Sequence, residues 1–247
     1  MKQKLGEFKI KYLFITIACI LFVYLVFVKM AKAEGMTSNV KRSDFDCYVI
    51  NLDKNEDRLQ NFTLSYSSSG LKGEPFIRVK AVYGKDINYG SYISENAELK
   101  MTPGMVGCFL SHLQTYDMIL NGNKDYALVF EDDANITEPL DTNVVSNIFD
   151  SVPSDWDIIL LGYDLSNPVH KYEKMDGCLK VYNFWGTHAY FIKRTAIAKF
   201  LDFAKPPFTN QIDFMMGDLC KKGFLKVYAI PNRIVFQEAR YTDVQVF

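Results

Sequence analysis

Several features that would narrow the function at once are missing from this sequence. It has no internal repeat, no low-complexity block and no run of basic residues, and its 28 Lys and Arg nearly balance its 29 Asp and Glu. Because the net charge is only −1, the chain gives no indication of a nucleic-acid partner, and we expect none. With 49% hydrophobic and 23% charged residues, the 247 residues have the composition of a globular protein with one substantial domain.

Cysteine is also scarce. Outside the N-terminal apolar run there are four, and each stands in an apolar context that suits a buried free thiol, although the four could also pair in an oxidising compartment. They are Cys47, Cys108, Cys178 and Cys220. No pair of them has metal-ligand spacing, so the sequence indicates no zinc site.

The N-terminal 44 residues differ from the rest of the chain. An uncharged run from Tyr12 to Val28 lies between lysines and is just long enough for a membrane-spanning helix. A cleavable signal peptide is the alternative, because Ala31-Lys32-Ala33 resembles a cleavage site. We favour an uncleaved anchor, since the apolar run is longer than a usual signal core and lysines crowd that site.

The lysines before the run place the N-terminus inside and the rest of the chain on the far side of the membrane. We therefore expect a single-pass type II membrane protein, with its globular domain in the lumen of the ER or Golgi if the source is eukaryotic or viral. The expected divisions are a cytoplasmic tail at 1–11, a transmembrane signal anchor at 12–28, a stem at 29–44 and a globular domain at 45–247.

From residue 45 onward, short apolar runs alternate with segments of helical periodicity. This alternation predicts an α/β layered sheet flanked by helices. The expected strands are 45–50, 75–81, 126–130, 157–161, 179–184, 188–192 and 225–230, and the expected helices are 54–69, 105–120, 195–203 and 211–222, before an irregular tail.

Three consecutive acids, Glu131, Asp132 and Asp133, follow the buried strand at 126–130. In an open α/β sheet, ligands bind beyond the carboxyl ends of the strands. Because side chains alternate along an extended backbone, we expect Glu131 and Asp133 to face one way and Asp132 the other. A hard divalent ion, Mn²⁺ or Mg²⁺, shared with a phosphate would relieve the repulsion among them. The alternative is a solvated acidic turn.

Seven segments, taken in order, resemble glycosyltransferase family 25, the family of lipooligosaccharide and collagen galactosyltransferases. The resemblance covers nearly all of residues 45–245. It rests on Val49–Asp53 with Asp57-Arg58, Ala81–Gly84, Thr102–His112, Glu131–Ala134, Gly186–Tyr190, Gln211–Asp213 and Pro231–Gln237. It implies a GT-A-type nucleotide-sugar-binding sheet whose carboxylate motif, Glu131 to Asp133, grips Mn²⁺ and the donor diphosphate.

The resemblance also implies an inverting reaction. We expect the transfer of a hexose, galactose or glucose, from a UDP-sugar to a hydroxyl of a glycan, glycolipid or glycoprotein acceptor. Inversion needs a base that deprotonates the acceptor hydroxyl, and Asp213, near the start of a helix, is our candidate. A helix-capping role is the alternative for this residue.

Further residues are candidates for donor binding. Asn51, Leu52 and Arg58 follow the first strand, where a nucleotide would lie, although a solvated arginine is an alternative for Arg58. Gly186 permits close backbone approach to a sugar. The remaining candidates are Ser111, His112, His188 and Gln237, of which the histidines have a structural role as their alternative.

The sequence departs from the family pattern at Met105, where the family usually has Glu. This leaves open a catalytically silent, sugar-binding member of the family. A metal-dependent nucleotidyl- or phosphotransferase is a second alternative, but the chain has no Gly-x-x-x-x-Gly-Lys loop.

Overall fold

The computed structural model describes residues 40–41, 44–71, 75–97, 101–167 and 169–238. The chain divides into two compact units, Met1–Asn39 and Val40–Phe247, and the described residues all belong to the second. The expected anchor at 12–28 and most of the expected stem therefore lie outside the described residues. Within the described part, no helix has the length and apolar character needed to cross a bilayer.

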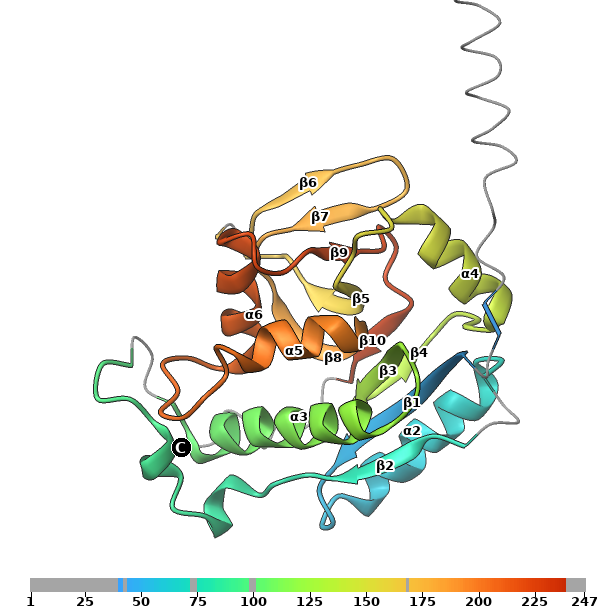
Figure 1. The fold of residues 1–247 in the computed structure, drawn as a ribbon. Coiled ribbons are helices and arrows are strands. Elements are labelled where there is room, and N and C mark those ends of the chain that lie inside the picture. The colour runs from blue at the N-terminus through green and yellow to red at the C-terminus, as the bar shows by residue number, and fades with distance from the viewer. Residues whose placement is uncertain (1–39, 42–43, 72–74, 98–100, 168, 239–247) are drawn as a thin grey trace, which may run out of the picture. The chain divides into compact units, whose positions relative to one another are not determined.

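The domain is built on a mixed sheet of eight strands in the order β2-β1-β3-β8-β5-β9-β7-β6 (Figure 1). A small antiparallel sheet pairs β10 with β4. The strands are β1 (Phe45–Asn51), β2 (Ile77–Lys80), β3 (Tyr126–Glu131), β4 (Ala134–Ile136), β5 (Ile158–Asp164), β6 (Tyr172–Lys174), β7 (Leu179–Val181), β8 (Trp185–Lys193), β9 (Val227–Ala229) and β10 (Val235–Gln237).

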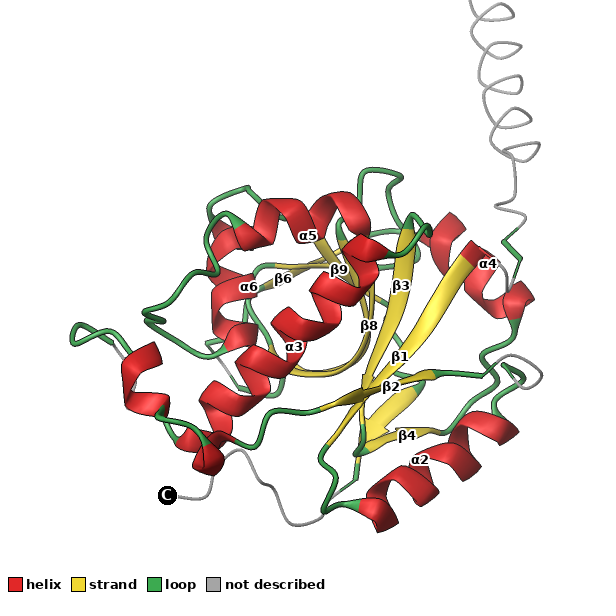
Figure 2. Ribbon diagram, turned by 60° about the horizontal axis from the view of Figure 1, so that its bottom comes forward, coloured by secondary structure: helices red, strands yellow, loops and turns green. Residues whose placement is uncertain are grey.

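Helices cover both faces of the large sheet (Figure 2). The helices α3, α5 and α6 pack on one face, and α2 and α4 pack on the other. Their bounds are α2 (Glu56–Ser68), α3 (Pro103–Asn121), α4 (Thr142–Ser151), α5 (Arg194–Leu201) and α6 (Ile212–Lys221), with short 3₁₀ turns at Gly84–Asp86 and Tyr89–Tyr92. This arrangement confirms the expected α/β class.

Strand β1 shows why two helical layers form. Its side chains alternate between the faces, so that Cys47 and Val49 belong to the core under α2 and α4, whereas Tyr48 and Ile50 belong to the core under α3, α5 and α6. A strand buried on both faces reads as a continuous apolar run. Val40, in the expected stem, is already buried in the α2–α4 core, and its N–H donates to Ser146 Oγ at 3.1 Å.

The strand directions bring several polar strand ends to one edge. Strands β2, β1 and β3 are mutually parallel, while β8 runs antiparallel to both β3 and β5. The carboxyl ends of β1, β3 and β5 therefore meet the amino end of β8, as the pairing of Asp164 with Trp185 shows. This is the edge at which open α/β sheets bind ligands.

Most expected elements are confirmed, but four were not predicted. The expected strand at 179–184 is shorter, and α4, β4 and β6 had no prediction. The tail, expected to be irregular, forms β10 because it pairs with β4, about a hundred residues earlier, through partners such as Gln237 and Ala134. All four cysteines in the described part are free thiols, as their apolar contexts indicated.

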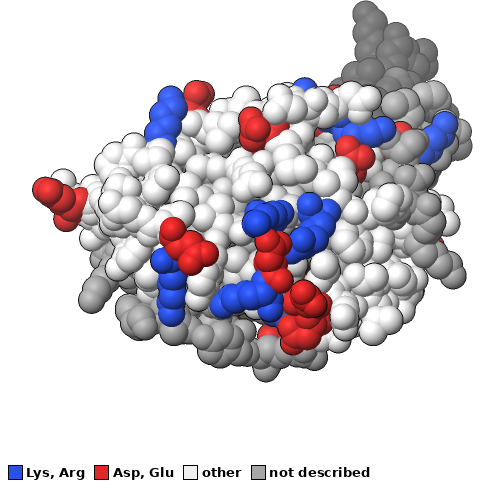
Figure 3. Space-filling view, turned by 90° about the horizontal axis from the view of Figure 1, so that it is seen from below, with Lys and Arg blue, Asp and Glu red and all other residues white. Residues whose placement is uncertain are grey.

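Charged side chains of both signs lie next to one another on the face drawn in Figure 3. Ion pairs of this mixed kind include Asp53 with Arg78 and with Lys80, each at 2.7 Å. On this face, therefore, the two signs are mixed and neither forms a patch of its own.

Candidate active site

Backbone contacts fix the start of α3 against the loop that follows β2. Thr102 caps the helix by accepting the Met105 N–H at 3.1 Å, and the Met105 sulfur in turn accepts the Thr102 N–H at 3.5 Å. A Cβ on Gly107 would lie 2.5 Å from the Val82 carbonyl oxygen, so only glycine permits this approach. Ser111 Oγ accepts the Val82 N–H at 2.8 Å, which gives this donor-binding candidate a structural task.

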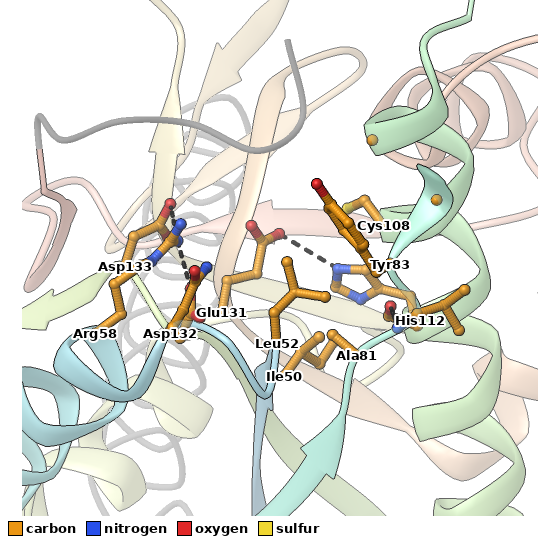
Figure 4. Close-up of a pocket in the computed structure, with 15 residues that line it drawn as sticks. Ile50, Leu52, Arg58, Ala81, Tyr83, Cys108, His112, Glu131, Asp132 and Asp133 are labelled. Atoms are coloured by element: carbon orange, nitrogen blue, oxygen red, sulfur yellow. Dashed lines mark hydrogen bonds and ion pairs between the residues drawn. The ribbon is translucent and has the colours of Figure 1, made fainter. Parts of the chain in front are cut away.

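Arg58 of α2 joins the two aspartates of the acidic motif. Its guanidinium contacts Asp132 Oδ1 and lies 3.0 Å from Asp133 Oδ2 (Figure 4). The expected alternation, with Asp132 facing away from Asp133, is therefore wrong. The reason is that β3 ends at Glu131 and the chain turns through Asp132-Asp133 into β4, so strand periodicity no longer applies.

Asn51, at the end of β1, holds this cluster in place. It is 1% exposed, and its amide donates to Asp132 Oδ2 at 2.7 Å and to the Asn55 carbonyl at 3.0 Å. Its own oxygen accepts from Arg78 Nε at 2.9 Å. Asn51 thus orients Asp132 across the β1–β3 edge, while Leu52 next to it lines the adjoining cavity.

Glu131 has a different set of partners. Thr187 of β8 donates its hydroxyl to Glu131 Oε1 at 2.6 Å, and His112 Nε2 of α3 lies 3.3 Å from the same oxygen. The other ring nitrogen of His112 lies 2.8 Å from the Tyr190 hydroxyl, which is 2.8 Å from the Tyr116 hydroxyl. Figure 4 shows the two sets apart, with Arg58 among the aspartates and His112 facing Glu131.

These surroundings shift the pKa values of two nearby carboxyl groups, Glu131 and Asp133, in opposite directions. Burial alone would raise the pKa of Glu131, but the hydrogen bonds from His112 and Thr187 outweigh it and hold this pKa at about 2. Burial raises the pKa of Asp133 to about 7, helped by the charge of Glu131 and opposed by Arg58 and Gln237. Negative charge is therefore less well compensated at Asp133 than at Glu131.

The residues present fit a hard divalent cation at Asp133. Its Oδ1 atom is buried and has no hydrogen-bond partner among the residues that the structure describes. Its Oδ2 accepts from Gln237 Nε2 at 3.0 Å, and its carbonyl accepts the Glu238 N–H at 2.8 Å. Carboxylate and amide oxygens are the ligands that Mn²⁺ and Mg²⁺ prefer, so Asp133 and Gln237 supply a suitable donor set.

Asp213 lies in the first turn of α6 and faces the start of β8. Its carboxylate accepts the Gly186 N–H at 3.1 Å and the Phe214 N–H at 2.8 Å. Burial raises its pKa to about 6, and these backbone hydrogen bonds limit the rise. The helix N-cap is Gln211, so Asp213 is not the N-cap residue, but its carboxylate in the first turn accepts one of the free N–H groups there, as the structural alternative also expects.

Gly186 and its neighbour His188 shape the wall beside Asp213. Gly186 has φ of +87°, a conformation that side chains other than glycine rarely adopt. His188 is buried against Gly162, where an added Cβ would lie 2.2 Å from its Nε2 atom. Burial lowers the pKa of His188, which favours its neutral form.

Two cavities open at this edge of the sheet. The first, here the α2–α3 cavity, is lined by residues including Leu52, Arg58, Tyr83, His112 and Asp133. The second, the β8–α6 cavity, holds about 410 Å³ and is lined by residues including Trp185, Gly186, His188, Asp213 and Gln237. Its volume is that of a small-ligand pocket. Cys108 and Glu131 line both cavities, so they lie where the two adjoin.

The structure brings all predicted site residues to this edge, but it adds partners that the sequence analysis did not assign. Thr187 and Tyr190 hold Glu131 and His112, and Cys108 lies one helical turn before His112. All three lie in segments already singled out by resemblance. The i, i+4 spacing of Cys108 and His112 on one helix face was the available signal.

Comparisons with known proteins place this chain in a family. The family model described as glycosyltransferase family 25 (LPS biosynthesis protein) matches residues 45–216. Procollagen galactosyltransferase 1-A of Xenopus laevis is 27% identical over 181 residues, which are 66% of this chain and 29% of that protein. A glycosyltransferase 25 family member of Aedes aegypti is 28% identical over 128 residues, 47% of this chain and 20% of its own length.

Among solved structures, a mutant Drosophila β-1,4-galactosyltransferase 7 in complex with manganese, UDP-Gal and xylobiose aligns over 79% of this chain and 70% of its own, with a TM-score of 0.40 and 9% identity. The matched part of this chain spans less than a third of the length of the two curated relatives above. The family model covers well over half of the chain, including the β1 end, the acidic motif and Asp213. The chain belongs to glycosyltransferase family 25.

Proposed function

We propose that this chain is a metal-dependent, inverting glycosyltransferase of the GT-A type, which moves a hexose from a UDP-sugar to a hydroxyl of a glycan, glycolipid or glycoprotein. The observation that supports this most strongly is the buried, unpartnered Oδ1 atom of Asp133 at the carboxyl edge of the sheet. Galactose is the proposed sugar, because the Xenopus relative is called a procollagen galactosyltransferase.

The metal is proposed to be Mn²⁺ or Mg²⁺, held by Asp133 with Gln237. When bound, the metal would neutralise the charge of the leaving diphosphate. Asn51 and Arg58 keep Asp132 and Asp133 in place from the other side. The α2–α3 cavity holds only about 70 Å³, so a nucleotide would lie across its mouth, beside Leu52 and Tyr83.

Asp213 is proposed as the base that receives the proton of the acceptor hydroxyl. A pKa of about 6 leaves it ionised at neutral pH and more basic than an ordinary aspartate. The acceptor oxygen forms a bond to the anomeric carbon as the bond from that carbon to the diphosphate breaks, and UDP leaves. The Gly186 and Phe214 N–H groups fix the direction of the carboxylate during this step.

The departure at Met105 does not require a silent protein. Thr102-x-x-Glu would be a capping box, in which the Glu side chain accepts the N-cap N–H. Here the Met105 sulfur accepts the Thr102 N–H instead, so this position has a structural task that Met performs. A glutamate here could make the same capping contact, so its replacement by Met keeps this structural task.

The N-terminal run is proposed to be an uncleaved signal anchor at residues 12–28, on the basis of its length and flanking lysines. Alkaline carbonate extraction of the expressed protein tests this. Retention in the membrane is expected, whereas release of a protein that begins near Glu34 would replace the anchor with a cleaved signal.

Turnover with a panel of nucleotide sugars, measured with and without Mn²⁺, tests the proposed function. We expect transfer or slow donor hydrolysis from one UDP-hexose, abolished by a chelator and restored by Mn²⁺. Binding of UDP-sugars without turnover would favour the silent, sugar-binding alternative. Metal-dependent transfer of a nucleotidyl or phosphoryl group would instead favour the phosphotransferase alternative.

A further inference from the structure

Three side chains with metal-binding atoms meet where the two cavities adjoin. Cys108 and His112 lie one turn apart on α3 and face Glu131 at the end of β3 (Figure 4). Their ligand atoms, the Cys108 thiol, a His112 ring nitrogen and a Glu131 carboxylate oxygen, all lie within 4.8 Å of one another. This cluster is separate from Arg58 and the two aspartates, which contact each other on the α2 side.

The histidine of this cluster is oriented as metal-binding histidines usually are. Its Nδ1 atom lies 2.8 Å from the Tyr190 hydroxyl, which is supported by the Tyr116 hydroxyl. In metal sites, a hydrogen-bond partner on one ring nitrogen, here Nδ1, fixes the ring and leaves the other nitrogen for the metal. In this structure the other nitrogen, Nε2, is the one that faces Glu131.

The spacing of the ligand atoms also fits. Zinc binds histidine nitrogen and carboxylate oxygen at about 2.0–2.2 Å in tetrahedral geometry, which separates the two ligand atoms by about 3.3–3.5 Å. The observed separation of His112 Nε2 and Glu131 Oε1 is 3.3 Å. Cys108, which is partly buried and lines both cavities, is placed to supply the third ligand.

We propose that Cys108, His112 and Glu131 form a zinc site with a fourth, open position. Thiolate and imidazole ligands select Zn²⁺, whereas the oxygen ligands at Asp133 suit Mn²⁺ or Mg²⁺, so the two sites take different metals. On binding, the Cys108 thiol proton leaves to solvent, and His112 Nε2 gives up the proton that it directs at Glu131, so that the neutral ring carries its proton on Nδ1 toward Tyr190. Zinc–sulfur and zinc–nitrogen bonds form with no change in oxidation state. The sequence indicated no zinc site because only one of the three ligands is a cysteine.

Occupancy of this site has a consequence for catalysis that rests on the proposed function. Cys108 and Glu131 line both cavities, so a zinc ion between them stands at the junction where donor and acceptor would meet. Zinc at this position blocks that junction. We therefore expect Zn²⁺ to inhibit Mn²⁺-dependent transfer.

Cobalt substitution tests the site without any turnover. The full chain, purified in detergent and freed of metal, is titrated with Co²⁺ in excess Mg²⁺, which fills oxygen sites. We expect one equivalent of Co²⁺ to give the near-ultraviolet band of a cobalt–thiolate bond, and Zn²⁺ to remove it. Absence of this band in the wild type overturns the zinc site.

Matched variants locate the ligand. Cys108→Ser should lose the band, whereas Cys178→Ser, a buried cysteine of the other core, should keep it. Tyr190→Phe removes the hydroxyl that orients His112 and should weaken Co²⁺ binding roughly 10–100-fold. Circular dichroism checks that each variant is folded, and Cys108→Ala replaces Cys108→Ser if the serine variant is not.

Asp133→Asn separates this site from the proposed donor metal. The cobalt band should persist in Asp133→Asn, and its loss there would mean that the two sites are one. A band with no glycosyl transfer in any assay would leave the zinc site standing and overturn only the proposed function. Transfer without a band would do the reverse.

Discussion

Asp133 and Asp213 lie on two sides of one sheet edge and are surrounded in different ways. On the α2 side, Asp133 is crowded by Glu131 and Asp132 and shares the cation Arg58, and burial with this crowding raises its pKa to about 7. On the α6 side, Asp213 forms no ion pair with a cation in the described part of the chain and accepts two backbone N–H groups. Its pKa rises to about 6, chiefly through burial.

The difference separates two tasks for a carboxylate. A group crowded by like charges is relieved by a further cation, which suits a metal ligand. A group held by neutral donors, with a pKa just below neutral, is ionised yet basic enough to accept a proton. The α2 side is therefore the proposed metal and donor side, and the α6 side is the proposed acceptor side.

Asp213→Asn removes the proposed base on the α6 side, and we expect it to have the largest effect on the transfer rate. Loss of a general base typically lowers the rate by roughly 10²–10⁴-fold, and an effect confined to the transition state appears in kcat. KM for the UDP-sugar should stay within about twofold. Asp218→Asn, a half-exposed position on the same helix, is the control and should keep wild-type kcat.

Arg58→Met breaks the α2 side by removing the cation shared by Asp132 and Asp133. Removing one partner of a buried ion pair typically costs about 3–5 kcal/mol, because the other charge is left uncompensated. We expect the free energy of unfolding in urea to fall by about this amount, with part of the loss recovered in Mn²⁺. An unchanged unfolding midpoint would show that Arg58 does not compensate the aspartates.

Part of the candidate site could be predicted from the local sequence. The apolar run 126–130 followed by three acids was enough to place the acidic motif at a strand end. The position of Asp213 near the start of a helix was enough to make it a candidate for the base. The hydrogen-bond partners of these acids could not be predicted, because they lie far away along the chain. Thr187 lies 56 residues from Glu131, and Gln237 lies 104 residues from Asp133. Such pairs depend on strand order, which periodicity does not specify.

The clearest error was the prediction that the Asp132 and Asp133 side chains face opposite ways, and this error has a local cause. Alternation holds only while the backbone is extended, and β3 ends at Glu131. Asp favours turns, and an acidic turn was the stated alternative, but no Gly or Pro beside Asp132 and Asp133 fixed where the strand ends. Similarly, the pairing of β10 with β4 was hidden because each strand has only three residues.

Thr187→Val sharpens the comparison at Glu131, which lies between the two sides. The hydroxyl donates to a partly buried carboxylate, and a hydrogen bond to a charged group contributes about 1.5–3 kcal/mol. We expect a loss of stability near the lower value, together with a raised pKa of Glu131. Thr142→Val, at the start of α4, is a control at which the loss should be smaller.

The pH dependence of kcat/KM gives the smallest effect, tenfold per pH unit. At saturating Mn²⁺, which keeps Asp133 ionised, protonation of Asp213 below about pH 6 should reduce kcat/KM, which should be level between pH 7 and 8. The same raised pKa means that Asp213 favours folding below pH 3.8 and that this contribution is lost as pH rises through about 6. Asp213→Asn should therefore be no less stable than wild type at pH 7.5.

The division of tasks between the two sides is tested most directly by one paired measurement. Calorimetry gives the affinity for UDP with and without Mn²⁺, and single-turnover kinetics gives the transfer rate, for wild type, Asp133→Asn and Asp213→Asn. We predict that Asp133→Asn loses the Mn²⁺-dependent part of UDP affinity, while Asp213→Asn keeps it and loses the transfer rate. Metal-dependent UDP binding retained in Asp133→Asn but lost in Asp213→Asn would contradict the account.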